Sequence, residues 1–186
     1  TVPAGFYQEQ ELVKLLLMYG SNEIDIEGYD ENNNPVIYKI NVAAFIIDDL
    51  KNDDILFKDE THKMIFDIFD KALDDEMLPK EQFFVSHENE KIAELAANLL
   101  SSRYKLDNWG KHEIKVKTET DVLSKMVYSS ILRFKDMVID EKRIELTRQI
   151  METNNIDDQI ILLARKKKLD ELRMKINKEL GIVITK

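Results

Sequence analysis

Apolar residues recur every three or four positions through most of the chain, which is the spacing of one face of an α-helix. The first such segment runs from about residue 8 to Tyr19, and Gly20 follows it as a helix stop. Asn41 is expected to cap a second helix that begins at Val42. Further helices are expected at about 61–75, in a short segment that begins with Pro79, and after a cap at Ser86, where Ile92, Leu95, Ala96 and Leu99 form the apolar face.

The pattern changes between residues 23 and 40. Two short apolar segments, 24–26 and 36–40, flank a polar stretch that ends in Asn34 and Pro35. This arrangement fits a loose β-hairpin and a long loop equally well. A further short strand is expected at 114–116, in a connection that contains the only tryptophan, Trp109.

The last third of the chain is expected to form two long helices. The Thr118–Asp121 segment fits a helix start signal, and no helix breaker follows before 153–155. Apolar residues make up 11 of the 19 positions in 121–139 but only 4 of the 15 in 141–155, so the second half of this helix is expected to leave the core. Asn155 then caps a final helix that Gly181 ends. Its expected seam is Ile156, Ile160, Leu163, Leu169, Leu172, Ile176 and Leu180.

The short turn between these helices makes them antiparallel. The sequence therefore predicts a mainly α fold, in which a helical bundle precedes a long antiparallel helical hairpin. The bundle is expected at 1–139 and the hairpin at 140–186, and the two share the long helix 121–152.

Composition narrows the possible functions. The 186 residues include 5 Gly, 3 Pro and no Cys, which favours long helices and excludes disulfides and thiolate zinc sites. The net charge of −9 argues against general nucleic-acid binding. Residues 141–186 nevertheless carry 11 Lys and Arg against 8 Asp and Glu, so the tail is basic and the rest acidic. With no signal peptide or membrane span in view, we expect a cytoplasmic protein.

Candidate catalytic groups are few. Glu27 and Asp30 resemble the carboxylate motif of Toprim domains, but no Asp-x-Asp follows, so a surface loop is the expected interpretation. His62, His87 and His112 lack metal-site spacing and are expected in surface or cap positions. We expect no catalytic residue, cofactor or metal in this chain.

Four stretches of the sequence carry a family resemblance: Tyr7–Val13 through Tyr19 and Gly20, Phe83–His87, Leu132–Lys135 and Lys178–Ile184. With these stretches the sequence resembles the C-terminal helicase-binding domain of bacterial replicative DNA primase (DnaG), in the form found in Bacteroidetes-like sequences. This resemblance implies an N-terminal helical bundle and a C-terminal hairpin that docks on the hexameric, DnaB-type replicative helicase. It implies no catalysis by this segment, because the primase's zinc-binding and catalytic domains lie elsewhere.

Three functions are open at this point. The first is helicase docking by a monomer, without direct nucleic-acid or membrane contact. The second is a regulatory or scaffold protein that self-associates through its hairpin as a short coiled coil. The third is an enzyme that uses Glu27 and Asp30 with a divalent metal. The expected partner-binding residues lie on the distal hairpin: Ile144, Arg148 and Met151 on one helix, and Ile156, Ile160, Leu163, Lys166 and Lys167 on the other.

Overall fold

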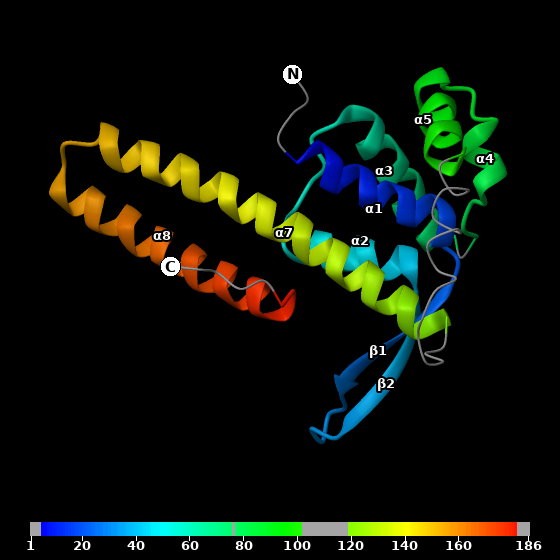
Figure 1. Cartoon of the computed structure of the whole chain (residues 1–186), viewed down its shortest axis with the longest axis horizontal. Coiled ribbons are helices and arrows are strands. Elements are labelled where there is room, and N and C mark those ends of the chain that lie inside the picture. The colour runs from blue at the N-terminus through cyan, green and yellow to red at the C-terminus, as the bar shows by residue number, and fades with distance from the viewer. Residues whose placement is uncertain (1–4, 76, 102–118, 182–186) are drawn as a thin grey trace. The chain divides into compact units, whose positions relative to one another are not determined.

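The computed structural model describes residues 5–75, 77–101 and 119–181 (Figure 1). The fold is mainly helical with one small antiparallel sheet, and it ends in a long helical pair, as the sequence predicts. The predicted strand at 114–116, Trp109 and His112 lie outside the described residues. The elements in chain order are α1 (Phe6–Tyr19), β1 (Glu23–Tyr29), β2 (Pro35–Asn41), α2 (Val42–Asn52), α3 (Glu60–Asp74), α4 (Glu81–Val85), α5 (Glu90–Ser101), α7 (Glu119–Glu152) and α8 (Ile156–Glu179).

The chain divides into two compact units, Thr1–Tyr128 and Ser129–Lys186. The boundary predicted from the sequence follows residue 139, and this division follows Tyr128; both positions lie inside α7, which contributes residues to both units. At about 1.5 Å per residue, the 34 residues of α7 span about 51 Å. No helix in the described ranges combines the length and the apolar content that a membrane span needs.

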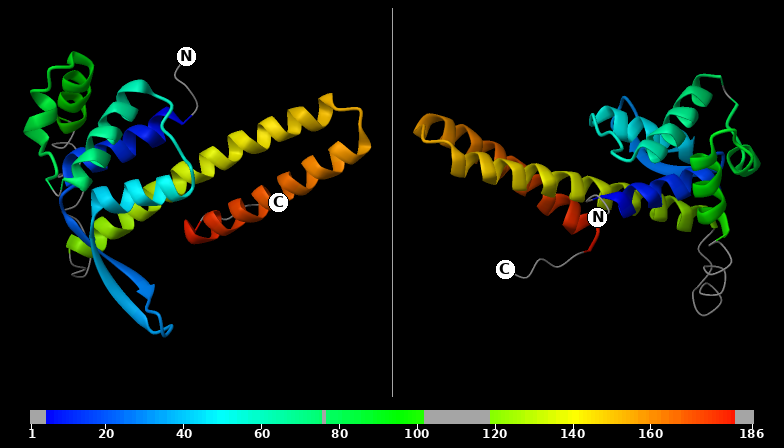
Figure 2. Two further views of the ribbon diagram at one scale, coloured as in Figure 1. Left: turned by 180° about the vertical axis from the view of Figure 1, so that it is seen from behind. Right: turned by 90° about the horizontal axis from the view of Figure 1, so that it is seen from above.

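The core of the first unit forms around α1, which packs against α2, α3, α4 and α5 (Figure 2). Leu12 and Leu16 of α1 are fully buried, as the apolar periodicity predicts. The rings of Phe69 and Phe84 stack with their centroids 5.1 Å apart, which joins α3 to α4. Each buried side chain of this size contributes about 1.5–3 kcal/mol through the hydrophobic effect.

Gly20 ends α1 at a place where only glycine fits. A Cβ atom at this position would lie 2.5 Å from the carbonyl oxygen of Leu16 and 2.8 Å from Cε1 of Phe69. Both distances are shorter than van der Waals contact. The predicted helix stop is therefore also a point of close approach between the end of α1 and Phe69 of α3.

Side-chain caps set several helix starts. The Asn41 side chain accepts a hydrogen bond from the backbone N–H of Ala44 at 2.7 Å, and Asn155 likewise caps α8, as predicted. Two other expectations were wrong. Pro79 precedes α4 instead of starting it, and the cap of α5 is Asn89, since Ser86 ends α4.

The segment from Glu23 to Asn41 is a β-hairpin, which resolves the alternative that the sequence leaves open. Ile24 pairs with Ile40, which places both on one face of the sheet, and neighbouring pairs alternate between the faces. The carboxylate of Asp30 accepts hydrogen bonds from the backbone N–H groups of Asn32 and Asn34, at 2.9 and 2.8 Å. These bonds close the turn.

A buried polar link joins α1 to the start of α3. The Glu9 carboxylate accepts hydrogen bonds from the backbone N–H groups of Lys58 and Asp59, at 2.7 and 3.1 Å. His62 Nδ1 lies 3.1 Å from the same carboxylate, and both side chains are almost completely buried. The expectation of a surface or cap position for His62 was therefore wrong. Its partner is 53 residues away in the sequence, and no local spacing reveals it.

We predict that Glu9→Gln lowers the free energy of unfolding of the first unit by about 3 kcal/mol, because a buried carboxylate that holds several hydrogen bonds loses its charge. Chemical denaturation of the full chain measures this change. Glu11→Gln is the matched control, since Glu11 is exposed on the same helix. Its effect should stay within about 0.5 kcal/mol. Equal effects of the two substitutions would contradict a structural role for the buried link.

Candidate protein-docking surface on the helical hairpin

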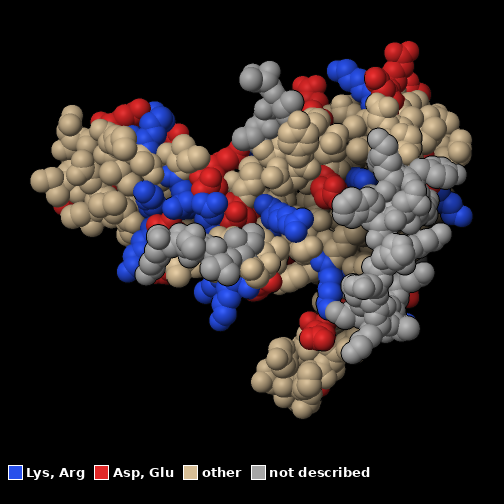
Figure 3. Space-filling view, in the orientation of Figure 1, with Lys and Arg blue, Asp and Glu red and all other residues tan. Residues whose placement is uncertain are grey.

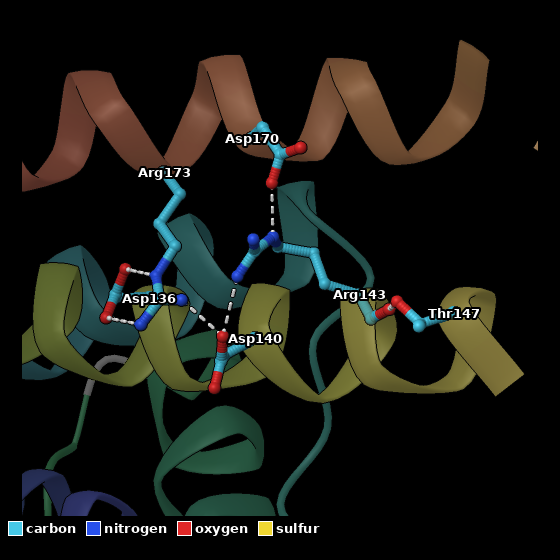
Figure 4. Close-up of polar contacts among 6 residues, drawn as sticks. All are labelled: Asp136, Asp140, Arg143, Thr147, Asp170 and Arg173. Carbon is cyan, nitrogen blue, oxygen red and sulfur yellow. Dashed lines mark hydrogen bonds and ion pairs between the residues drawn. The ribbon is translucent and has the colours of Figure 1, made fainter. Parts of the chain in front are cut away.

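An ion-pair cluster joins the two helices of the hairpin (Figure 4). Arg173 of α8 donates to Asp136 of α7 at 2.9 Å and also to Asp140. Arg143 of α7 donates to Asp140 at 2.8 Å and to Asp170 of α8 at 2.5 Å. Asp140 therefore lies between two guanidinium groups, one from each helix. We call these five residues the ion-pair cluster.

The ion-pair cluster stabilises the charged form of Arg173. The hydrogen bond with Asp136 raises the pKa of Arg173 above its ordinary value, so this side chain is a cation at every physiological pH. Single surface ion pairs contribute little, but networks with shared partners contribute more. The cluster links residues 136–143 of α7 to residues 170–173 of α8, which is the pairing expected of two antiparallel helices.

The row of α8 that faces α7 is more polar than the sequence suggests. Gln159, at the start of this row, donates a hydrogen bond to the backbone carbonyl of Thr153 at 2.8 Å. The half-buried positions then recur at three and four residues and include both apolar and charged side chains. The row is Gln159, Leu162, Lys166, Leu169, Arg173 and Ile176.

The expected seam of α8 was therefore wrong in its first half. Ile156, Ile160 and Leu163 are exposed, as is Leu172. Leu169, Ile176 and Leu180 are half-buried, as a seam requires. The polar row faces α7 because its ionic partners lie on that helix, and a search for apolar spacing along one helix does not detect them.

Most of the exposed apolar side chains of the two helices lie on the same flank of the hairpin. We call the half-buried row on each helix its inner row, and on α7 this row contains Arg143, Thr147 and Ile150. The exposed residues Ile144, Arg148 and Met151 each directly follow one of these positions. A residue that follows an inner position lies about 100° further around its helix. Because both helices are right-handed and they run antiparallel, this rotation turns both sets toward the same side. On α8, the corresponding positions are Ile160, Leu163 and Lys167.

We call this surface the apolar flank, made of Ile144, Arg148, Met151, Ile156, Ile160, Leu163 and Lys167. Seven of the eight predicted partner-binding residues thus lie together, and the eighth, Lys166, belongs to the inner row. Met174, which is also exposed and follows Arg173, continues the flank and was missed by the sequence analysis. On the face seen in Figure 3, the end of the hairpin around 153–155 carries mainly uncharged surface.

Arg148 is held in place by two carboxylates of its own helix. Its guanidinium lies 2.6 Å from Glu145 and 2.6 Å from Glu152. Hydrogen bonding to Arg148, and to a lesser extent to Gln149, lowers the pKa of Glu145 from 4.5 to about 2. The same contacts raise the pKa of Arg148. Arg148 is therefore presented as part of an ion triplet instead of as an isolated cation.

The basic run 165–168 is distributed around α8. Lys166 lies in the inner row and Lys167 on the apolar flank. Arg165 and Lys168 precede inner positions and so lie on the opposite flank, together with Ile161. No single face collects the whole run, which agrees with the sequence-based interpretation of a solvated helix.

The other candidate sites do not form a metal-binding cluster within the described ranges. Glu27 lies on β1, and the oxygens of Asp30 are engaged in closing the turn. The imidazole of His87 accepts a hydrogen bond from the backbone N–H of Asn89, at the start of α5. No group of three His, Asp or Glu side chains with metal-binding geometry occurs among the described residues.

These features define a mainly helical protein with a terminal, ion-paired helical hairpin. Residues 4–183 match the family of a domain of unknown function, DUF8430, and the chain belongs to this family. No curated protein and no solved structure matches the chain.

We predict that Arg148→Gln raises the pKa of Glu145 from about 2 toward 4.5, because the largest cause of the depression is removed. The hydrogen bond from Gln149 remains and should keep the value below 4.5. In the wild type, the interaction with Arg148 is present above the ordinary pKa and is lost as the pH falls toward 2.

Carboxyl-detected NMR titration of the wild type and the variant measures this shift. Asp30 serves as the internal control, because Asn34 lowers its pKa and the substitution does not touch that turn. A Glu145 titration that is the same in both proteins would contradict the ion triplet.

Proposed function

We propose that this chain is a protein-docking domain that binds its partner through the apolar flank of the hairpin. The observation that carries the proposal is the exposure of five large apolar side chains on one flank. They are Ile144, Met151, Ile156, Ile160 and Leu163, each more than half exposed. Exposed apolar groups gathered on one face are typical of interaction sites. A helical pair can present them as anchors for a groove or for another helix pair.

The partner proposed from the sequence resemblance is the hexameric replicative helicase. In this proposal the chain is the helicase-binding domain of a bacterial DNA primase and docks the primase on the helicase during RNA primer synthesis. Catalysis would belong to other domains of the primase. The ion-pair cluster supports the proposal because it holds the hairpin closed without consuming the apolar flank.

The two neighbouring isoleucines of α8 provide a sharp test. Ile160 is on the apolar flank and 59% exposed, whereas Ile161 is on the opposite flank and 51% exposed. Ile160→Asp should weaken binding to the same organism's helicase by roughly tenfold to a hundredfold, the usual effect of losing an interface anchor. Ile161→Asp should bind like the wild type. Calorimetric titration measures both affinities, and circular dichroism checks that both variants remain helical.

Equal affinities of the two variants would contradict docking through the apolar flank. If the wild-type chain itself fails to bind, the helicase is not the partner.

Self-association is the second candidate function, because the same flank could pack against the flank of a second copy. Sedimentation velocity of the chain alone tests it. A dimer that Ile160→Asp dissociates and Ile161→Asp preserves would favour the scaffold function. If the chain is monomeric at all concentrations, the self-association function is excluded.

A further inference from the structure

A groove of about 730 Å³ lies in the first unit, beside the β-hairpin. The strand β1 contributes Asp25, Ile26 and Glu27 to its lining. The opposite wall includes Phe45 of α2 and Tyr128 of α7. The groove is separate from the apolar flank of the helical hairpin, and the inference drawn from it does not depend on the proposed function.

The groove follows the edge of β1. Successive residues of a strand point to opposite faces of the sheet, so Asp25, Ile26 and Glu27 cannot all line a groove on one face. They can all line a groove that runs beside the strand. No residue of β2 lines it. Within the described residues β1 pairs with β2 alone, and we call its other edge, which borders the groove, the open edge of β1.

The open edge is unusual because native proteins commonly cover or block such edges. A two-stranded sheet is only marginally stable by itself, and a third strand would supply further backbone hydrogen bonds. The ribbon extends away from the helices of its own unit (Figures 1 and 2), and Tyr29 and Ile37 near its turn are each 69% exposed. These features are typical of a site that receives an added strand.

The lining specifies the chemistry of the occupant. Asp25 and Glu27 stand two residues apart, on the same face of β1. Lys125 of α7 is the cation among the lining residues. The excess of carboxylates favours a cationic ligand, and the apolar wall formed by Phe45 and Tyr128 favours apolar side chains. In an extended peptide, successive side chains point to opposite faces. Cationic and apolar residues would therefore alternate along the sequence of the ligand.

We infer that the open edge of β1 binds an extended segment of a partner protein, with alternating apolar and cationic residues, as an added β-strand. The backbone of the segment would pair with β1, and its Lys or Arg side chains would meet Asp25 and Glu27. Affinity would come mainly from the backbone bonds, and selectivity from the charges.

The probe for this site is a labelled hexapeptide with blocked ends that alternates valine and lysine. Fluorescence anisotropy should show saturable binding to the full chain, weakening as salt is raised. A hexapeptide with glutamate in place of lysine should bind at least several-fold more weakly. Glu27→Lys should weaken binding of the lysine peptide by about fivefold, because one attraction is replaced by a repulsion.

Glu31→Lys is the matched control, since it makes the same charge change at an exposed residue in the turn, outside the groove, and should bind like the wild type. A lysine peptide with N-methylated valines should lose binding, because it cannot pair with a strand edge. The inference would be overturned by absent binding of the lysine peptide, by equal loss in the two variants, or by undiminished binding of the N-methylated peptide. It would also be overturned if β1 proved to be occupied by a second copy of the chain.

Discussion

The shared carboxylate of Asp140 is the contact on which the hairpin depends. It receives Arg143 from its own helix and Arg173 from α8, so that one anion connects the two helices. Charged side chains with fixed partners set the register of the pair. Since the seam is largely closed by these polar contacts, several large apolar residues remain outside it. The apolar flank is thus exposed because polar contacts, and not apolar ones, hold the two helices together.

The two units offer surfaces of opposite character. The hairpin presents an apolar flank whose cations are partly paired with neighbouring carboxylates, as the ion triplet around Arg148 shows. The first unit presents a groove lined by Asp25, Glu27 and Asp49 beside an open strand edge. The first surface suits an apolar helical partner and the second an extended cationic one. Two ligands with such different chemistry need not compete.

The local features of the fold could be predicted from the sequence. The apolar periodicity located most helices, and Gly20, Asn41 and Asn155 marked their ends correctly, because capping depends on residues within a few positions of one another. The decline in apolar residues after 139 indicated that the long helix becomes solvent-exposed. Most of the candidate docking residues were proposed from this decline, because the few apolar residues of a mainly polar helix can be identified in the sequence.

What the sequence by itself determined is most of the helices, the ends marked by Gly20, Asn41 and Asn155, and the presence of a helical hairpin after the bundle. The tertiary structure decided which face of α8 meets α7, because the partners of Arg173 lie on another helix. It also decided that His62 is buried against Glu9, and that residues 23–41 form a hairpin with one edge beside a groove. The face of α8 and the burial of His62 depend on groups far apart in the chain, and local patterns contain no information about such contacts. The hairpin was one of two structures that the local pattern allowed, and the pairing of its strands decided between them.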